Sequence, residues 1–188
     1  MTPRVVLGIS GASGAAIGLR IIAILTEMHA ETDLVVTAAA MRTLAAEVGL
    51  DALDAVDSGS VRRHAVDSIG ATIASGSTPT SGMIVAPCSM RTMSAIANSL
   101  SDNLLVRAAD VHLKERRPLV LVARETPLHL GHLRAMTTVT EMGAIVMPPV
   151  PAFYLKPQKI DDIIDQIGRR AVDLLRIARP ISTAWQGL

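Results

Sequence analysis

The feature that most constrains the fold is a regular alternation of short apolar runs with longer segments of helical periodicity. Strands buried on both faces of a parallel sheet are expected to be almost continuously apolar, and such runs cover residues 4–9, 33–37, 82–86, 119–123 and 144–147. Helical periodicity occupies residues 15–28, 39–48, 92–98, 102–116, 129–142 and about 160–177. This order predicts an α/β fold with a doubly wound, mainly parallel sheet and helices on both faces, a Rossmann-like or flavodoxin-like three-layer sandwich.

The length of 188 residues fits one domain, which we expect to span the chain. Residues 50–80 interrupt the alternation, because they are rich in Asp, Ser, Gly and Thr and have weak periodicity. We interpret them as a long excursion that carries a functional loop at Ser75-Gly76-Ser77.

Composition argues against a nucleic-acid-binding protein and for contacts between subunits. The net charge is +1 and the basic residues are scattered, while 49% of the residues are apolar and only 19% are charged. Cys88 is the single cysteine, so no intramolecular disulfide can form. The first apolar run is too short for a signal peptide core or a membrane span. We therefore expect a cytoplasmic homo-oligomer that binds neither nucleic acid nor membranes.

The loop after the first run, Gly8-Ile9-Ser10-Gly11-Ala12-Ser13-Gly14, leads directly into a helix. Its glycines permit close approach of the backbone, and the N-terminus of the helix offers unpaired N–H groups to an anion such as phosphate. The spacing is neither the dinucleotide fingerprint nor a P-loop, and three alanines, not an acidic residue, follow Thr37. A mononucleotide such as FMN fits this pattern; the alternative is a tight turn without a ligand.

Two further loops carry polar groups at predicted strand ends. Ser89 and Thr92 can anchor a phosphate or flavin carbonyls, or simply cap the helix that follows. Cys88 has no His or Lys near it in sequence, which is typical of a buried structural thiol. Arg124 and Glu125 can place an acid or base at the rim of the sheet, or form a surface ion pair.

The helix predicted over 102–116 carries two cations on one face, Arg107 and Lys114, with Asp110 between them. They can clamp a phosphate monoester, or Asp110 can pair with both in a solvated network. A stiff proline-rich loop presents Phe153 and Tyr154, and packing into the core would explain only Phe153. The histidines form no cluster with cysteines or carboxylates, so we expect them to cap helices or lie at the surface and not to bind a metal.

Taken together and in order, these segments resemble a known family. The matching segments are Gly8 to Gly14, Ser75-Gly76-Ser77, Pro87-Cys88-Ser89-Met90-Arg91-Thr92, Asp102-Asn103-Leu104-Leu105, Arg107-Ala108-Ala109-Asp110-Val111, Leu113-Lys114-Glu115-Arg116-Arg117, Arg124-Glu125-Thr126-Pro127-Leu128 and Pro151-Ala152-Phe153-Tyr154. They resemble the flavin prenyltransferases of the UbiX type, also described as small subunits of aromatic acid decarboxylases.

The resemblance implies a metal-independent transfer of a dimethylallyl group from its monophosphate to N5 and C6 of reduced FMN. The product, prenylated FMN, would serve a separate decarboxylase of the UbiD type, in ubiquinone biosynthesis or in breakdown of phenolic acids. By the same resemblance the assembly would be a dodecamer. The chain from about residue 158, a helix and a tail, would make oligomer contacts and close the site.

The resemblance also assigns roles to individual residues. FMN would be held by Gly11, Ala12, Ser13, Thr37, Ser89, Met90, Arg91, Thr92 and Arg124. The prenyl phosphate would be held, partly across subunit boundaries, by Ser75, Arg107, Lys114, Tyr154 and Arg170, with Trp185 closing over the site. Catalysis would involve Glu125 as acid and base, Glu47 as an auxiliary acidic residue, and Ser13.

The sequence departs from the family pattern at the loop before Ser75, where several relatives carry an aromatic residue and this chain has Ile69 and Ile73. Thr37 stands where relatives often have Ser, which keeps the hydroxyl. Three other functions compete with prenyl transfer: an FMN-dependent cysteine-type decarboxylase of the same fold, a direct decarboxylase of aromatic acids, and a non-catalytic FMN carrier.

Overall fold

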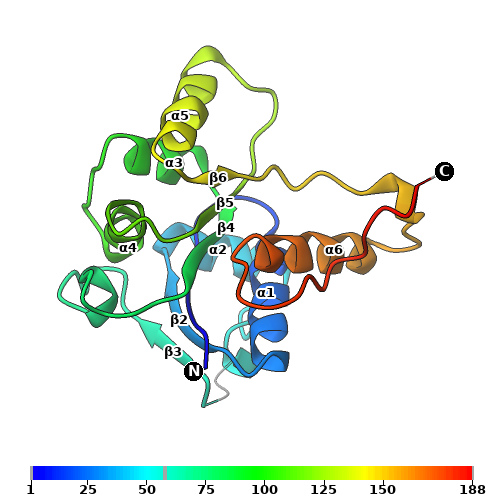
Figure 1. The fold of residues 1–188 in the computed structure, drawn as a ribbon, viewed down its shortest axis with the longest axis horizontal. Helices are drawn as coiled ribbons and strands as arrows, with labels where there is room; N and C mark the ends of the chain where they lie inside the picture. Colours follow the sequence, from blue (N-terminus) through cyan, green and yellow to red (C-terminus); the bar gives the residue numbers. More distant parts are fainter. Residues whose placement is uncertain (1, 57–58, 188) are drawn as a thin grey trace.

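A single six-stranded sheet forms the centre of the computed structural model, which describes residues 2–56 and 59–187 (Figure 1). The strands lie in the order β3-β2-β1-β4-β5-β6 and every neighbouring pair is parallel. Their bounds are β1 Arg4–Ile9, β2 Glu31–Val36, β3 Val61–His64, β4 Gly82–Cys88, β5 Leu119–Ala123 and β6 Ile145–Val146. The predicted fold class is confirmed, and the strand order reverses between β1 and β4, where doubly wound sheets bind their ligands.

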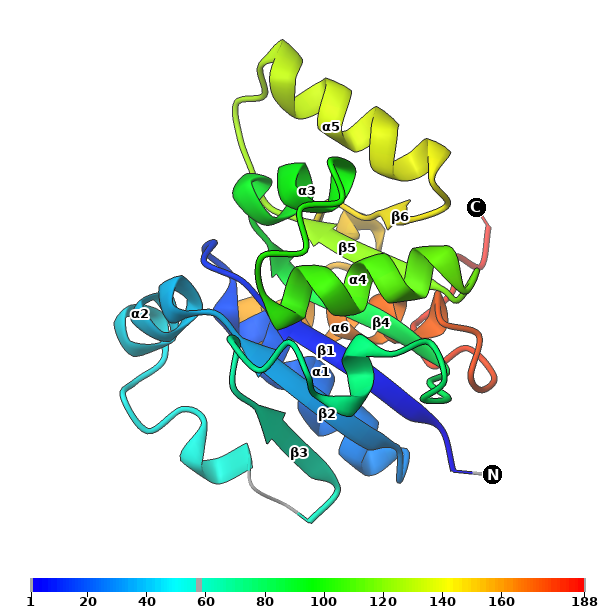
Figure 2. The ribbon, with the colours of Figure 1, turned by 90° about the vertical axis from the view of Figure 1, so that its left-hand side faces the viewer.

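Helices cover both faces of the sheet (Figure 2). They are α1 Ala15–Glu27, α2 Ala38–Glu47, α3 Met90–Ala97, α4 Leu104–Lys114, α5 Leu130–Glu141 and α6 Ile160–Asp173, with short 3₁₀ turns η1 Asp54–Val56, η2 Thr72–Ala74 and η3 Phe153–Leu155. α1 and α6 pack together on one face, whereas α3, α4 and α5 lie on the other. After β6 the chain runs away from the body and returns through α6 (Figure 1).

Alternating side chains of β1 divide the apolar core into two clusters. Val5, Leu7 and Ile9 belong to the cluster under α1 and α6, whereas Val6 belongs to the cluster under α3, α4 and α5. At Gly8 a Cβ atom would lie 2.9 Å from Leu105 Cγ, so α4 packs directly on bare backbone there. Both faces of β1 are therefore buried away from water, which explains its continuously apolar sequence.

The edge strand β3 was not predicted, because its sequence Val-Arg-Arg-His lies within the polar excursion. A buried ion network attaches it to the sheet. Asp33, which is 2% exposed, accepts hydrogen bonds from Arg4 Nε at 2.6 Å and pairs with His64 Nε2 at 2.7 Å. Burial raises the pKa of the Asp33 carboxyl, but the hydrogen bonds and charges of Arg4 and His64 outweigh burial and hold that pKa below its usual value.

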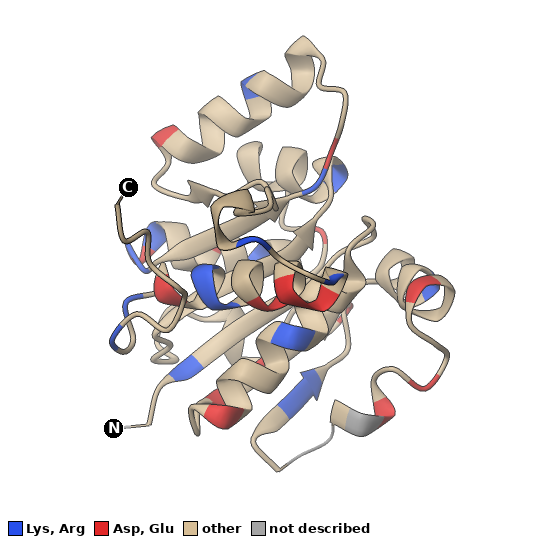
Figure 3. Ribbon diagram, turned by 90° about the vertical axis from the view of Figure 1, so that its right-hand side faces the viewer, with Lys and Arg blue, Asp and Glu red and all other residues tan. Residues whose placement is uncertain are grey.

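The molecular surface carries interleaved charges. Figure 3 shows basic and acidic residues mixed along α6 and its surroundings, with no stripe of one sign on this side of the molecule. Within the described ranges, no helix combines the length and the apolar character needed to cross a bilayer.

We expect Asp33→Asn to lower the free energy of unfolding at pH 7 by about 2 kcal/mol or more, because Arg4 loses its buried counter-charge. The pKa of Asp33 is lowered in the folded state, so its contribution is complete above the unfolded pKa and is lost as the pH falls through the folded pKa. Urea unfolding of both proteins from pH 7 downward should show a difference that narrows in acid. The exposed control Asp67→Asn should change little; a pH-independent difference for Asp33→Asn would contradict this account.

Candidate active site

One buried hydroxyl joins the two loops that meet at the reversal of strand order. Ser10, 1% exposed, donates through Oγ to the carbonyl of Pro87 at 2.9 Å and accepts from the N–H of Ser89 at 2.8 Å. The loop after β1 and the loop after β4 therefore have a fixed separation. Sequence reasoning assigned Ser10 no role, since only its position after a predicted strand could have singled it out.

The loop after β2 is attached to the same edge. The N–H of Thr37 donates to the carbonyl of Ile9 at 3.0 Å, and the Thr37 hydroxyl caps α2 by accepting from the N–H of Ala40 at 3.1 Å. The start of α2 packs closely on the first loop, because a Cβ at Gly11 would lie 3.3 Å from the Cα of Ala39. Thr37 and the first loop thus lie in contact at the carboxyl edge of β1 and β2.

Glu47, at the end of α2, reaches back over the start of α1. Its Oε2 accepts from the N–H groups of Gly14 and Ala15, both at 2.9 Å. The expectation that these N–H groups are unpaired is therefore wrong, because a carboxylate of the chain itself occupies the positive end of the helix. Burial raises the pKa of Glu47, but hydrogen bonds from Ser13, Ala15 and Gly14 and the charge of Arg124 bring that pKa below its usual value.

The loop after β4 combines capping with surface contacts. Ser89 Oγ accepts from the N–H of Thr92 at 3.2 Å and donates to Thr92 Oγ1 at 3.1 Å, which confirms the capping role. Met90 and Thr92 are buried, at 6% and 3% exposure. Arg91 lies at the surface, where it pairs with Asp102 at 2.6 Å.

Cys88 is fully buried at the end of β4. Burial raises the pKa of its thiol to about 12, so the thiolate is not populated near neutral pH. The interpretation of Cys88 as a structural residue is confirmed.

Arg124 and Glu125 follow β5 at the same rim. The N–H of Arg124 donates to the carbonyl of Cys88 at 3.1 Å, which places this loop beside the β4 loop. Glu125 is partly exposed and accepts from the N–H of Thr126 at 3.1 Å. No ion pair joins Arg124 to Glu125, and across residues 2–56 and 59–187 the Arg124 guanidinium pairs with no carboxylate. The alternative of a surface ion pair is therefore wrong.

The cations of α4 lie beside the Ser75 loop. Arg107 pairs through Nη1 with Asp110 at 2.7 Å and donates through Nε to the carbonyl of Ala74 at 3.2 Å. Lys114 pairs with its neighbour Glu115, so Asp110 does not bridge both cations as the network alternative supposed. Ser75 is exposed and its hydroxyl lies 2.8 Å from that of Ser77.

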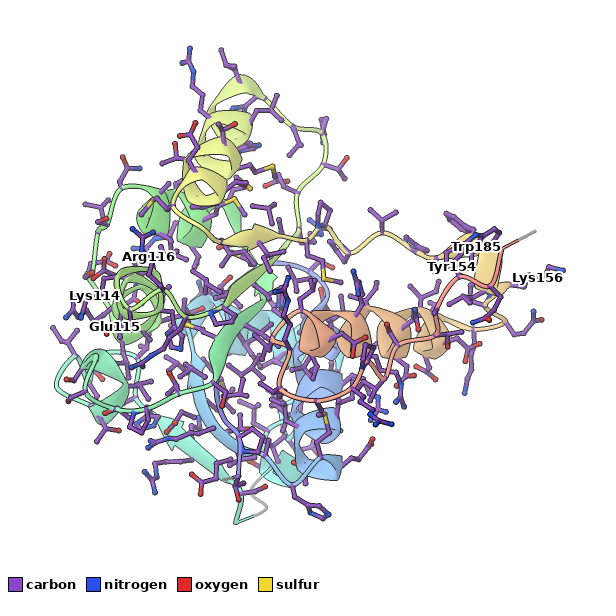
Figure 4. The ribbon with its side chains drawn as sticks, in the orientation of Figure 1. Lys114, Glu115, Arg116, Tyr154, Lys156 and Trp185 are labelled. Atoms are coloured by element: carbon purple, nitrogen blue, oxygen red, sulfur yellow. The ribbon has the colours of Figure 1, made fainter. Side chains whose placement is uncertain are left out.

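Tyr154 and Trp185, which are also expected around the substrate, lie on the side of the molecule opposite Lys114 (Figure 4). Tyr154, Arg170 and Trp185 line one cavity of about 450 Å³. The rings of Tyr154 and Trp185 meet edge to face, with centroids 5.0 Å apart. Phe153 is 74% exposed, so it does not pack into the core. Lys114, from the first group, lies far from this cavity in Figure 4.

The prediction that the histidines cap helices or lie at the surface is only partly confirmed. His29 is exposed, and His129 caps α5 by accepting from the N–H of Gly131 at 3.0 Å. His64 and His112 are neither capping nor surface residues, because His64 belongs to the Asp33 network and His112 is 1% exposed. Within the described ranges, no three metal-ligating side chains come together.

Comparison with known proteins gives consistent matches over nearly the whole chain. A model of the family described as Flavoprotein matches residues 1–172. Flavin prenyltransferase UbiX of Thauera aromatica is 50% identical over 184 residues, which cover 98% of this chain and 94% of that protein.

Two crystal structures are closely similar. AnUbiX (PadA1), in complex with FMN and dimethylallyl pyrophosphate, has a TM-score of 0.93 at 42% identity and covers 100% of both chains. A dodecameric FMN-dependent UbiX-like decarboxylase from Escherichia coli O157:H7 has a TM-score of 0.90 at 40% identity, covering 98% of this chain and 100% of that one.

We expect Ser10→Ala to lower the free energy of unfolding by about 2 kcal/mol, because it leaves the N–H of Ser89 without its buried acceptor and leaves the carbonyl of Pro87 with only the backbone N–H of Ser10. Chemical denaturation measures the loss, and hydrogen exchange at Ser89 should accelerate. The exposed control Ser68→Ala should leave both unchanged. Equal stability of Ser10→Ala and the parent would show that this hydroxyl does not hold the loops together.

Proposed function

The chain belongs to the flavoprotein family, among the flavin prenyltransferases of the UbiX type, and we propose that it joins a dimethylallyl group from dimethylallyl monophosphate to N5 and C6 of reduced FMN. The product is prenylated FMN. We further propose that a UbiD-type decarboxylase receives this product and that the protein works in the cytoplasm.

One observation carries the proposal: every residue that the resemblance assigns to FMN lies at the carboxyl edge of β1, β2, β4 or β5, either in the loop after the strand or in the first turn of the helix that follows it. These loops flank the strand reversal, the position at which doubly wound sheets bind nucleotides. Ser10 and Thr37 bind the loops to one another, so the edge is preformed.

The chemistry of this edge suits FMN. Arg124 offers a guanidinium that pairs with no carboxylate in the described part of the chain, and Ser13 is an exposed hydroxyl on the first loop. These groups can hold the phosphate or the carbonyl oxygens of a flavin. We place the flavin phosphate away from the N–H groups of Gly14 and Ala15, because Glu47 occupies them.

Bound reduced FMN supplies the nucleophilic nitrogen and carbon. The residues of this chain have two tasks. Arg107, Lys114 and Arg170 stabilise the negative charge that develops on the phosphate oxygen as the allylic C–O bond breaks and its electron pair leaves with the phosphate. Glu125 accepts the proton displaced from the flavin and protonates the departing phosphate. Glu47 already accepts the N–H groups of Gly14 and Ala15 and its pKa is lowered, which makes it a weaker proton acceptor, so we give it the auxiliary role.

The substrate site is completed by neighbouring copies of the chain. Lys114 and the pair Tyr154 and Trp185 lie on opposite sides of the molecule (Figure 4), so one chain cannot place them on one phosphate. We propose a dodecamer, in which the chain from about residue 158 makes subunit contacts and covers the site. The exposure of Ile160 at 74%, and of Phe153 at 74% just before this segment, fits a surface that is buried on assembly.

The competing functions fit less well. A cysteine-type decarboxylase requires a free catalytic histidine after an early strand, whereas His64 is tied to Asp33. An FMN carrier needs no second phosphate site, so that function does not account for the two cations of α4, Arg107 and Lys114. Direct decarboxylation of an aromatic acid needs an electron sink that the residues at this edge do not supply.

The decisive test is anaerobic incubation of the purified protein with reduced FMN and dimethylallyl monophosphate, followed by mass spectrometry of the flavin. We expect the flavin to gain the mass of one isoprene unit, with release of inorganic phosphate. An unchanged flavin mass would refute the proposed function. Consumption of an aromatic acid without change in the flavin would favour the decarboxylase.

We expect Glu125→Gln to keep its affinity for FMN and to form product at least about 100-fold more slowly, because the proton acceptor is lost while shape is retained. Flavin fluorescence titration measures binding, and the mass assay measures turnover. Glu141→Gln, on the exposed end of α5, provides the matched control and should behave as the parent. Parental turnover by Glu125→Gln would remove Glu125 from the mechanism.

A further inference from the structure

A guanidinium beyond the end of α4 holds the loop that carries Ser75. Arg117 Nη2 donates to the carbonyl of Gly76 at 2.6 Å, and Nη1 donates to the carbonyl of Thr78 at 2.7 Å and to Thr80 Oγ1 at 3.0 Å. Three acceptors within five residues surround one planar group. This fork geometry suits arginine and cannot be reproduced by lysine.

The third acceptor continues into the core of α4. His112 Nδ1 donates to the carbonyl of Ala108 at 2.7 Å, so Nε2 of the neutral ring accepts from the Thr80 hydroxyl at 3.0 Å. Burial, with the charge of Arg117, lowers the pKa of His112, which keeps the ring neutral. Each group in this series donates to the next: Arg117 to Thr80, Thr80 to His112, and His112 to the carbonyl of Ala108. The loop is thus bound to α4 by a continuous series of hydrogen bonds.

The hydrogen bonds of Arg117 to residues 76–80, together with the bond between Thr80 and His112, are called the clamp below. The clamp places the Ser75 loop against the last turn of α4. A Cβ added at Gly76 would lie 2.7 Å from Lys114 Nζ, so the loop backbone and the lysine side chain are in direct contact. Arg107, about two turns earlier on the same face of the helix, contacts the other end of the loop through the carbonyl of Ala74. Ser75 therefore lies between the two cations of α4 because its loop is held at both ends.

We propose that Arg117 is a positioning residue for the prenyl phosphate, which acts by holding Ser75 between Arg107 and Lys114. The proposal rests on the proposed function, since it concerns the phosphate half of the same site. Arg117 is half-buried and both its terminal nitrogens already have acceptors. It acts through the loop and not as a further ligand of the phosphate.

The chain supplies a matched control in the adjacent residue. The Arg116 side chain is exposed and makes no hydrogen bond or ion pair in the described part of the chain (Figure 4). Arg117→Lys and Arg116→Lys make the same chemical change one residue apart, and both keep the charge. An effect that is seen only in Arg117→Lys is therefore caused by loss of the hydrogen bonds of Arg117 and not by a change in the local charge.

Two measurements test the proposal. In the free protein, Arg117→Lys should accelerate hydrogen exchange of residues 74–80, while Arg116→Lys should not. In the mass assay, Arg117→Lys should raise the KM for dimethylallyl monophosphate by about tenfold, as expected for loss of charge-assisted hydrogen bonds. Its Kd for FMN should stay within about twofold of the parental value and its kcat should change less than KM.

Unchanged exchange in residues 74–80 of Arg117→Lys would overturn the proposal, as would an equal weakening of FMN and prenyl phosphate binding. If Arg117→Lys does not fold, Thr80→Val tests the same clamp by removing its middle hydroxyl, and exchange equal to that of the parent would overturn it. If the parent forms no prenylated flavin, the proposed function fails, while the exchange measurement still decides whether Arg117 holds the loop.

Discussion

The structure of the candidate site depends on one hydroxyl, that of Ser10. At the reversal of strand order the chains leaving β1 and β4 turn to opposite faces of the sheet, and the backbone bond from the N–H of Ser10 to the carbonyl of Pro87, at 3.2 Å, is reinforced by the Ser10 side chain. A hydroxyl can donate and accept at once, and Ser10 does both between Pro87 and Ser89 in a site closed to water. The spacing between Ser13 and Thr92, on which any ligand bridging the two loops relies, follows from these two bonds.

The two acidic residues of the candidate site, Glu47 and Glu125, have different electrostatic environments. Glu47 lies on the positive end of α1 with its oxygen engaged by two N–H groups, and its pKa is below the usual value. Such a carboxylate is a weak proton acceptor at neutral pH, because its charged form is already stabilised. Glu125 accepts a single local N–H at the rim and keeps lone pairs for a substrate proton. Environment, more than residue type, thus supports the proposed assignment of proton transfer to Glu125.

The sequence pattern predicted β1, β2, β4, β5 and β6 and the helices α1 to α6 closely, because each has an apolar run or a helical period that core packing requires. It missed β3, since an edge strand paired on one side can carry Arg62, Arg63 and His64 without loss. The motifs also identified the candidate residues. Their contacts could not be predicted, because Ser10 meets Ser89 across 79 positions and Glu47 meets Ala15 across 32, and local periodicity contains no such pairs.

The division of the proposed substrate residues between two sides of the molecule has a chemical rationale. An allylic cation must be protected from water, and a pocket lined by one chain at the rim of an open sheet stays hydrated. In the proposed assembly, Arg107 and Lys114 of one copy meet Tyr154 and Arg170 of others, so the pocket closes only when subunits associate. Until then Arg107 and Lys114 are paired with Asp110 and Glu115. A phosphate must displace these carboxylates, and a loop already fixed in place lowers the entropy cost of that exchange.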